Sequence, residues 1–292
     1  MTATEIITAA KYLCSISSTS YDTFLLQEVN FGQADFSRDI NWSFLENRGS
    51  ISSVASKYIY DLASDFDTIK SVIFKQDHIL RPVNWKQWIQ LNQSDSFGTP
   101  RYFIIKEGKL QVYPGTDAAA STTTLGAAIS STTATTITLT SVASIEGKGR
   151  ALIDSEVIEW QAISGSTIIN CRRGLEGTTA ATHLNGATFT YRNIEYDYYK
   201  TLTDIATEET SSIPTRYHEA LVLYAASRFF EREENETKAN NLYQRYLIIK
   251  EMAKKDLGEK QSQEFSTTLD DSEGNIPLRD NTYPPDSSLT QP

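Results

Sequence analysis

The sequence predicts an α+β protein. We expect a helical core (N-terminal helices plus a C-terminal helix pair), a mainly antiparallel β-sheet, an inserted small all-β domain and an extended C-terminal tail. Three observations predict this class. Helical periodicity of apolar residues occurs in the N-terminal part of the chain and again before the tail. Short β-branched runs separated by turn residues fill the middle. The last 34 of the 292 residues contain four prolines and an excess of acid.

The first 116 residues predict two helices followed by strands. The helices are expected over residues 4–16 and 21–30. β-branched and aromatic residues, which favour strands, cluster in three further runs, at residues 55–62, 69–74 and 79–83. A hairpin is expected over residues 102–113, where two apolar runs flank the turn dipeptide Glu107-Gly108.

Residues 117–191, which we term the β module, differ in composition from the chain on either side. Residues 118–145 contain no charged side chain, and apolar residues alternate with threonines within residues 134–142. Short apolar runs separated by turn dipeptides follow, and this pattern predicts a small all-β domain. Residues 194–200 have strand composition again. We therefore expect the β module to be inserted between two strands of one sheet.

Two amphipathic helices are expected after the β module. Pro214 suits the first turn of the first helix, whose apolar residues continue to Phe229. The second helix has an apolar stripe from Ala239 to Ile249 and is expected to end at Gly258, because glycine commonly terminates helices. The discontinuous core then consists of residues 1–116 and 192–258.

The tail, residues 259–292, carries seven acidic and two basic residues. Low hydrophobicity with high net charge predicts no independent fold. Isolated apolar residues recur along the tail without a period, and spaced anchors of this kind are typical of an extended segment that binds a partner. The candidate anchors are Phe265, Leu269, Ile276, Leu278, Tyr283 and Leu289.

No pattern in the sequence predicts a catalytic centre, a metal site or a cofactor. The histidines do not pair at ligand spacing, and the sequence has no His-Glu-x-x-His or Cys-x-x-Cys motif. Two cysteines are too few for a disulfide framework, so we expect both to be buried as small apolar residues.

The net charge is −10, from 27 basic and 37 acidic side chains. Affinity for a nucleic-acid backbone depends on cations that displace counterions, so tight DNA binding is disfavoured, whereas a channel that lets DNA pass is not. The N-terminal residues lack the basic and apolar regions of a signal peptide. No apolar run approaches the ~20 residues of a membrane span. We expect a soluble protein, made in the cytoplasm, that contacts no membrane.

Two further sets of residues are candidates for protein interfaces. Arg172 and Arg173 form a basic loop in the β module. This loop suits either a docking contact or a turn whose shape is set by its glycines, with both arginine side chains in solvent. Tyrosine is enriched at positions where one side of the side chain packs against protein and the other contacts water, as at protein interfaces. Four tyrosines on the C-terminal helices are therefore candidates for subunit contacts, with half-buried helix packing as the alternative: Tyr217, Tyr224, Tyr243 and Tyr246.

Several short motifs occur in a distinctive order along the core. They are WSFLE at 42–46, SVASKY at 53–58, LASDF at 62–66, GTPRY at 98–102, VYP at 112–114, IPTRYHEALV at 213–222 and YAA at 224–226. Together they resemble the head-to-tail connector (adaptor) proteins of tailed bacteriophages. In the β module, SEVIEW at 155–160 and CRRGLEGTTAATH at 171–183 are similar to a small module of various phage structural proteins.

The resemblance implies a structural virion protein at the head–tail junction, assembled in the host cytoplasm. It implies a homo-oligomeric ring, commonly a dodecamer, beneath the portal protein at the capsid vertex. Tail-tube, nozzle or fibre proteins would lie below the ring. The tail segment would reach toward the portal, and DNA would pass through the lumen without specific binding during genome ejection.

Two other functions remain open at this stage. The β module also suits a tail-tube or fibre-docking component of the virion. A virion-associated glycan-degrading enzyme would need paired carboxylates such as Asp154, Glu156 and Glu159. Their alternation with apolar residues favours solvent-facing positions on a strand instead.

Overall fold

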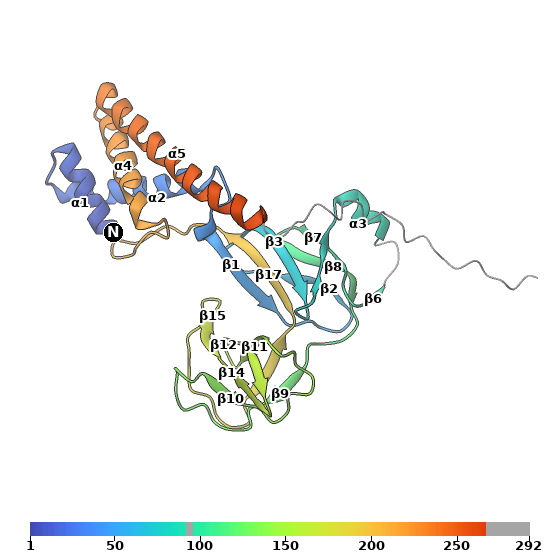
Figure 1. Ribbon diagram of the computed structural model, residues 1–292. Helices are drawn as coiled ribbons and strands as arrows, with labels where there is room; N and C mark the ends of the chain where they lie inside the picture. The colour runs from blue at the N-terminus through green and yellow to red at the C-terminus, as the bar shows by residue number, and fades with distance from the viewer. Residues whose placement is uncertain (92–95, 267–292) are drawn as a thin grey trace, which may run out of the picture.

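The computed structural model describes residues 1–91 and 96–266, with only the backbone from residue 257 on. A helical bundle forms one end of the molecule, small sheets form its middle, and the β module lies beside the sheets (Figure 1). Helices and predominantly antiparallel sheets occur together in one chain, which confirms the predicted α+β class.

Within the described residues, four helices form the bundle. They are α1 (Ala3–Cys14), α2 (Asp22–Ser37), α4 (His218–Arg232) and α5 (Glu236–Ser266). Short 3₁₀ turns precede α2, β1 and α4, namely η1 (Thr19–Tyr21), η2 (Ser43–Leu45) and η3 (Thr215–Tyr217). Helix α4 packs against the other three helices, and most of its side chains are buried. A helix that is apolar on nearly all sides occupies the centre of a bundle, which explains the place of α4.

Local sequence explains where the first helix begins but not where the last one ends. Helix α1 starts with a capping box, in which Thr2 accepts a hydrogen bond from the Glu5 amide and the Glu5 carboxylate accepts one from the Thr2 amide. The predicted end of the last helix at Gly258 is wrong, because α5 continues to Ser266. A single glycine costs only about 1 kcal/mol inside a helix, and the Lys, Glu and Gln residues around it are good helix formers. Residues 259–266, predicted as extended, are therefore helical.

A four-stranded and a five-stranded sheet pack together in the middle of the molecule. The first has the order β1 (Glu46–Ile51), β17 (Ile194–Lys200), β3 (Phe66–Phe74), β4 (His78–Ile79). The second has the order β2 (Lys57–Asp61), β8 (Lys109–Thr116), β7 (Tyr102–Lys106), β5 (Arg81–Pro82), with β6 (Phe97–Gly98) beside β8. Val72, Leu110 and Tyr196 belong to the core that the sheets share. Helix α3 (Trp85–Leu91) lies at the end of the molecule opposite the bundle (Figure 1).

The predicted hairpin and the predicted strand at residues 194–200 are confirmed as β7–β8 and β17. The expectation that β8 and β17 belong to one sheet is wrong, because each lies in a different sheet. Both strands face the same core, so their hydrophobic patterns do not reveal which neighbours they pair with. The chain thus leaves one sheet for the β module and returns in the other.

The strands of the β module surround a hydrophobic core of their own. The strands are β9 (Thr122–Thr124), β10 (Thr136–Thr138), β11 (Gly149–Ile153), β12 (Glu156–Trp160), β13 (Ala162–Ser164), β14 (Thr167–Ile169), β15 (Arg172–Leu175) and β16 (Thr188–Arg192). They form a five-stranded sheet, β15-β12-β11-β16-β9, and a three-stranded sheet, β10-β14-β13. Ile158, Trp160 and Phe189 are fully buried in this core, which is separate from that of the bundle.

Candidate functional site

The four candidate tyrosines lie on or beside the packed helices of the bundle. Tyr246 is fully buried, and Tyr217 and Tyr224 are 7% and 6% exposed. The Tyr224 ring lies 5.2 Å from that of Tyr246 and 6.4 Å from that of Tyr243. Side chains buried within one chain leave almost no area for a neighbouring copy. The interface prediction is therefore corrected to core packing for these three, while Tyr243 is half-buried and stays a candidate.

A polar contact fixes α5 on α2 at the edge of the bundle. The Lys250 ammonium donates to the Asp35 carbonyl at 2.7 Å and lies 3.0 Å and 3.1 Å from the carboxylates of Asp35 and Asp39. The Tyr246 hydroxyl donates to the Asp35 carboxylate at 2.5 Å. Burial would raise the pKa of Asp35, but the hydrogen bonds from Tyr246 and Lys250 outweigh it and lower that pKa.

A buried charged cluster lies inside the β module. Glu156 is 0% exposed and accepts hydrogen bonds from Arg173 Nε at 2.6 Å and Arg173 Nη2 at 2.7 Å. The backbone amides of Gly174 and Ala181 each donate a further bond of 3.0 Å to this carboxylate. A buried carboxylate with this many donors is fully satisfied, so the cluster holds β15 and the loop after it against β12.

His183 completes the cluster between two carboxylates. Its Nε2 lies 2.8 Å from Glu156 Oε2, and its Nδ1 lies 2.7 Å from Asp154 Oδ2. Burial alone would raise the pKa of Glu156. Hydrogen bonds from Arg173, the Ala181 amide, His183 and the Gly174 amide outweigh burial and lower this pKa to about 2.

Two interpretations of the β-module sequence are wrong. Glu156 does not face solvent, because both faces of β12 are covered and its neighbours Val157 and Ile158 are buried too. Arg173 is neither solvated nor available for docking, since only 5% of its side chain is exposed. Arg172 is 66% exposed and stays a docking candidate. The sequence analysis assigned no role to His183, because its contacts with Asp154 and Glu156 join residues distant in sequence.

A second polar group joins the β module to the sheets. Arg150 donates to the Arg48 carbonyl at 3.1 Å and forms an ion pair of 2.9 Å with Glu176. The Ser50 hydroxyl donates to Glu176 at 2.5 Å, and Arg192 donates to the Ser50 carbonyl. These contacts connect β1 to β11, β16 and the turn after β15, so they fix the orientation of the β module on the core.

The described residues offer no support for catalysis by the sequence candidates. Glu156 is enclosed and paired, so it has no access to a glycan. Among residues 1–91 and 96–266, no group of three His, Cys, Asp or Glu side chains is arranged to hold a metal ion. No helix in this part of the chain is both long and apolar enough to cross a membrane. Cys14 and Cys171 are buried as predicted, and burial raises the pKa of each thiol to about 11.

The tail anchors fall largely outside the described residues. Phe265 is a residue of α5, and at this position the structure describes the backbone only. The other predicted anchors, Leu269, Ile276, Leu278, Tyr283 and Leu289, lie beyond Ser266.

The sequence of this chain is similar to that of a known protein family. No curated protein matches the chain. The profile of the family described as SU10 adaptor protein matches residues 1–270. The chain belongs to this family. The match to the SU10 adaptor family includes every described element, and it confirms the phage adaptor family that the core motifs resemble. The protein is accordingly a structural adaptor and a virion component.

Proposed function

We propose that this protein is the head-to-tail adaptor of its virion. Copies form a ring, with a dodecamer expected from the resemblance, beneath the portal protein, and the ring joins the capsid to the tail while DNA passes through the lumen. The observation that carries this proposal is the match to the SU10 adaptor family over residues 1–270.

The layout of the chain supports this function. The helical bundle and α3 lie at opposite ends, and the β module projects from the middle (Figure 1). A subunit with distinct ends can contact one partner above and another below. The net charge of −10 suits a conduit, because each cation on its wall would add affinity for phosphate and slow the passage of DNA.

Mixing the full-length protein with purified portal protein tests the proposal. We expect a ring bound to the portal, visible by negative-stain microscopy and measurable by native mass spectrometry. Subunits that stay monomeric and do not bind portal at micromolar concentration would contradict it.

The C-terminal segment supplies the contact with the portal in this proposal. Because α5 is described to Ser266, a chain ending at Ser266 removes residues 267–292 and keeps every described residue of α5. This truncation also keeps Phe265, so it tests the other five anchors. We expect the truncated protein to fold and to bind portal more weakly than the full chain, as measured by biolayer interferometry. Equal affinities would contradict a role for these anchors.

The β module suggests a second function, docking of tail-tube or fibre proteins. It has its own core, is fixed on the sheets, and exposes 80% of Leu184 and 66% of the Arg172 side chain. Deleting residues 117–191 separates the possibilities. Virions that join tails but lack fibres would identify a docking module on an adaptor, whereas failure to join tails would place the β module in the junction itself.

A further inference from the structure

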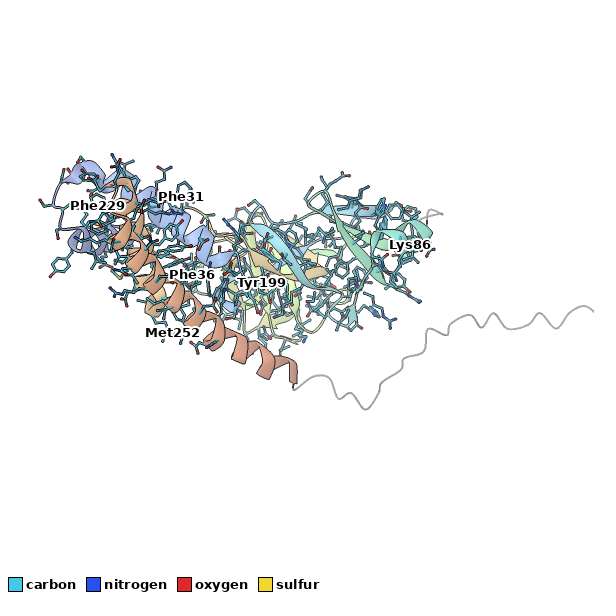
Figure 2. All side chains as sticks on the ribbon, turned by 90° about the horizontal axis from the view of Figure 1, so that it is seen from above. Phe31, Phe36, Lys86, Tyr199, Phe229 and Met252 are labelled. Atoms are coloured by element: carbon cyan, nitrogen blue, oxygen red, sulfur yellow. The ribbon has the colours of Figure 1, made fainter. Side chains whose placement is uncertain are left out.

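Helix α3 presents an uncovered apolar side at the end of the molecule opposite the bundle. Trp85 and Ile89, one helical turn apart and therefore on one side of the helix, are 51% and 49% exposed. Trp88, on the other side, is 4% exposed and packs against β8. Figure 2 shows Lys86 of this helix at the opposite end of the molecule from Phe229 of the bundle. Neighbouring exposed apolar side chains of this size favour an interaction surface.

The same end of the molecule is basic. From β4 to the end of β8, residues 78–116 carry five basic and two acidic side chains, whereas the whole chain has a net charge of −10. Two of the five cations lie beside a carboxylate. Lys106 is 3.7 Å from Glu107, and Lys109 is 2.7 Å from Asp61 of β2.

The other three cations of this region have no such partner. Lys86 lies on α3, and Arg81 lies in β5, which leads into α3. Arg101 lies beside Arg81, whose amide donates to the Arg101 carbonyl at 2.9 Å. All three are exposed, and none forms an ion pair with a described residue. We term the surface formed by these cations with Trp85 and Ile89 the α3 tip. It combines apolar area with uncompensated positive charge.

The C-terminal segment, residues 267–292, has the complementary chemistry. It contains five acidic residues, one basic residue and the five predicted apolar anchors that follow Ser266. Helix α5 runs from the outer end of the bundle toward the sheets, so the chain enters this segment beside the sheets (Figure 1). The 26 residues span up to about 85 Å when extended, nearly twice the length of about 45 Å of α5 itself. The segment is therefore long enough to reach the α3 tip.

We propose that the C-terminal segment of each copy docks on the α3 tip of the same chain. Its acidic residues pair with Arg81, Lys86 and Arg101. Its apolar anchors cover Trp85 and Ile89, as spaced anchors of an extended peptide do in other complexes. Attachment to the same chain gives an effective concentration on the order of 1 mM, so a contact with a Kd of about 0.1 mM is about 90% occupied. The contact needs no ring, and the portal of the proposed function would compete for the same segment.

The tryptophans of the chain provide a direct probe. Three of the four, Trp42, Trp88 and Trp160, are at most 4% exposed. Acrylamide quenching of tryptophan fluorescence therefore reports mainly on Trp85. We expect the quenching constant of the full chain to be roughly twofold or more below that of the chain ending at Ser266, because the docked segment shields the ring. Circular dichroism checks that both chains are folded. Equal quenching of two folded chains would overturn the proposal.

Two full-length variants make the test independent of truncation. Lys86→Glu reverses a cation of the α3 tip. Lys148→Glu makes the same change at an exposed lysine of the β module that forms no ion pair with a described residue. Lys86→Glu should raise quenching toward that of the truncated chain, whereas Lys148→Glu should keep the wild-type value. In the chain ending at Ser266, Lys86→Glu should change nothing, which separates lost docking from a local change around Trp85. Equal effects of the two full-length variants would contradict the contact.

Zero-length cross-linking identifies the residues and the copy involved. Carbodiimide joins lysine amines to carboxylates in contact, so the wild-type chain should give cross-links between Lys86 and acidic residues of 267–292. In a mixture of unlabelled and ¹⁵N-labelled chains, links within one chain support the proposal. Links only between chains, or links to Lys148 as frequent as those to Lys86, would overturn it.

A fluorescein-labelled oligonucleotide tests nucleic acid as the occupant of the α3 tip. We expect the full chain not to bind it at micromolar concentration. Equally tight binding to the full chain and to the chain ending at Ser266, lost in Lys86→Glu, would assign the tip to nucleic acid and overturn the proposal. None of these measurements uses the portal, so a failure of portal binding contradicts the proposed function and leaves this contact unaffected.

Discussion

The helical bundle and the β module bury polar groups in different ways. The bundle core consists mainly of apolar side chains. Its buried cation, Lys250, pairs with two carboxylates that remain partly exposed, Asp35 at 27% and Asp39 at 35%. The β module contains a carboxylate, Glu156, that is fully buried and paired with Arg173, whose side chain is 5% exposed.

The difference follows from how each region satisfies its backbone. Helices bond most of their own amides, so packing helix faces together does not require a side-chain acceptor for the backbone. Strand β15 and the loop after it leave the Gly174 and Ala181 amides in need of an acceptor, and Glu156 supplies it. We infer that the bundle depends on apolar area, whereas the β module depends on one carboxylate and its partners.

Arg173→Ala should give the largest effect. It leaves Glu156 as a buried charge without its cation, so we expect the unfolding free energy of the β module to fall by about 3–5 kcal/mol. The neighbouring Arg172→Ala is the matched control, because Arg172 is 66% exposed, and it should change stability by less than about 0.5 kcal/mol. Native-state hydrogen exchange of peptides from the β module measures both. Equal effects of the two substitutions would show that burial does not decide the outcome.

Acid should destabilise the β module through Glu156. The pKa of this group is about 2 in the folded chain against an ordinary value of 4.5, so its stabilisation is fully present above pH 4.5 and is lost as the pH falls through 2. The full difference is on the order of 3 kcal/mol. Hydrogen exchange at several pH values between 5 and 2 should show a steeper loss in the wild type than in Glu156→Gln. An unchanged slope in that variant would contradict the assignment.

The helices and most strands could be predicted because their patterns are local. Periodicity and the glycine turn locate α1, α4 and the β7–β8 hairpin. Strand β1 was missed because its sequence ENRGSI lacks β-branched residues before Ile51, and it forms through pairing with β17. Helix α3 lies in a short segment between strands and was also missed.

The candidate surfaces required contacts that the sequence does not encode locally. Glu156 alternates with apolar residues like an exposed strand residue, and only its contact with Arg173 explains why it is buried. Ile248 and Met252 are apolar residues of α5 that remain 58% and 62% exposed. Whether such residues stay uncovered depends on how the four helices pack.

Tyr246→Phe should give the smallest effect. It tests whether the Asp35 carboxylate needs the hydrogen bond from Tyr246 in addition to its contact with Lys250. It removes the hydroxyl that donates to Asp35 but keeps the ring in the core, and Lys250 still lies 3.0 Å from that carboxylate. The expected loss is therefore about 1 kcal/mol, the net value of one hydrogen bond. Tyr243→Phe is the control, since this half-buried hydroxyl has no hydrogen-bond partner among the described residues, and it should be close to neutral. Denaturant unfolding followed by far-ultraviolet circular dichroism, which reports mainly on the helices, measures both variants. A loss as large as that of Arg173→Ala would mean that the bundle also depends on a single polar contact.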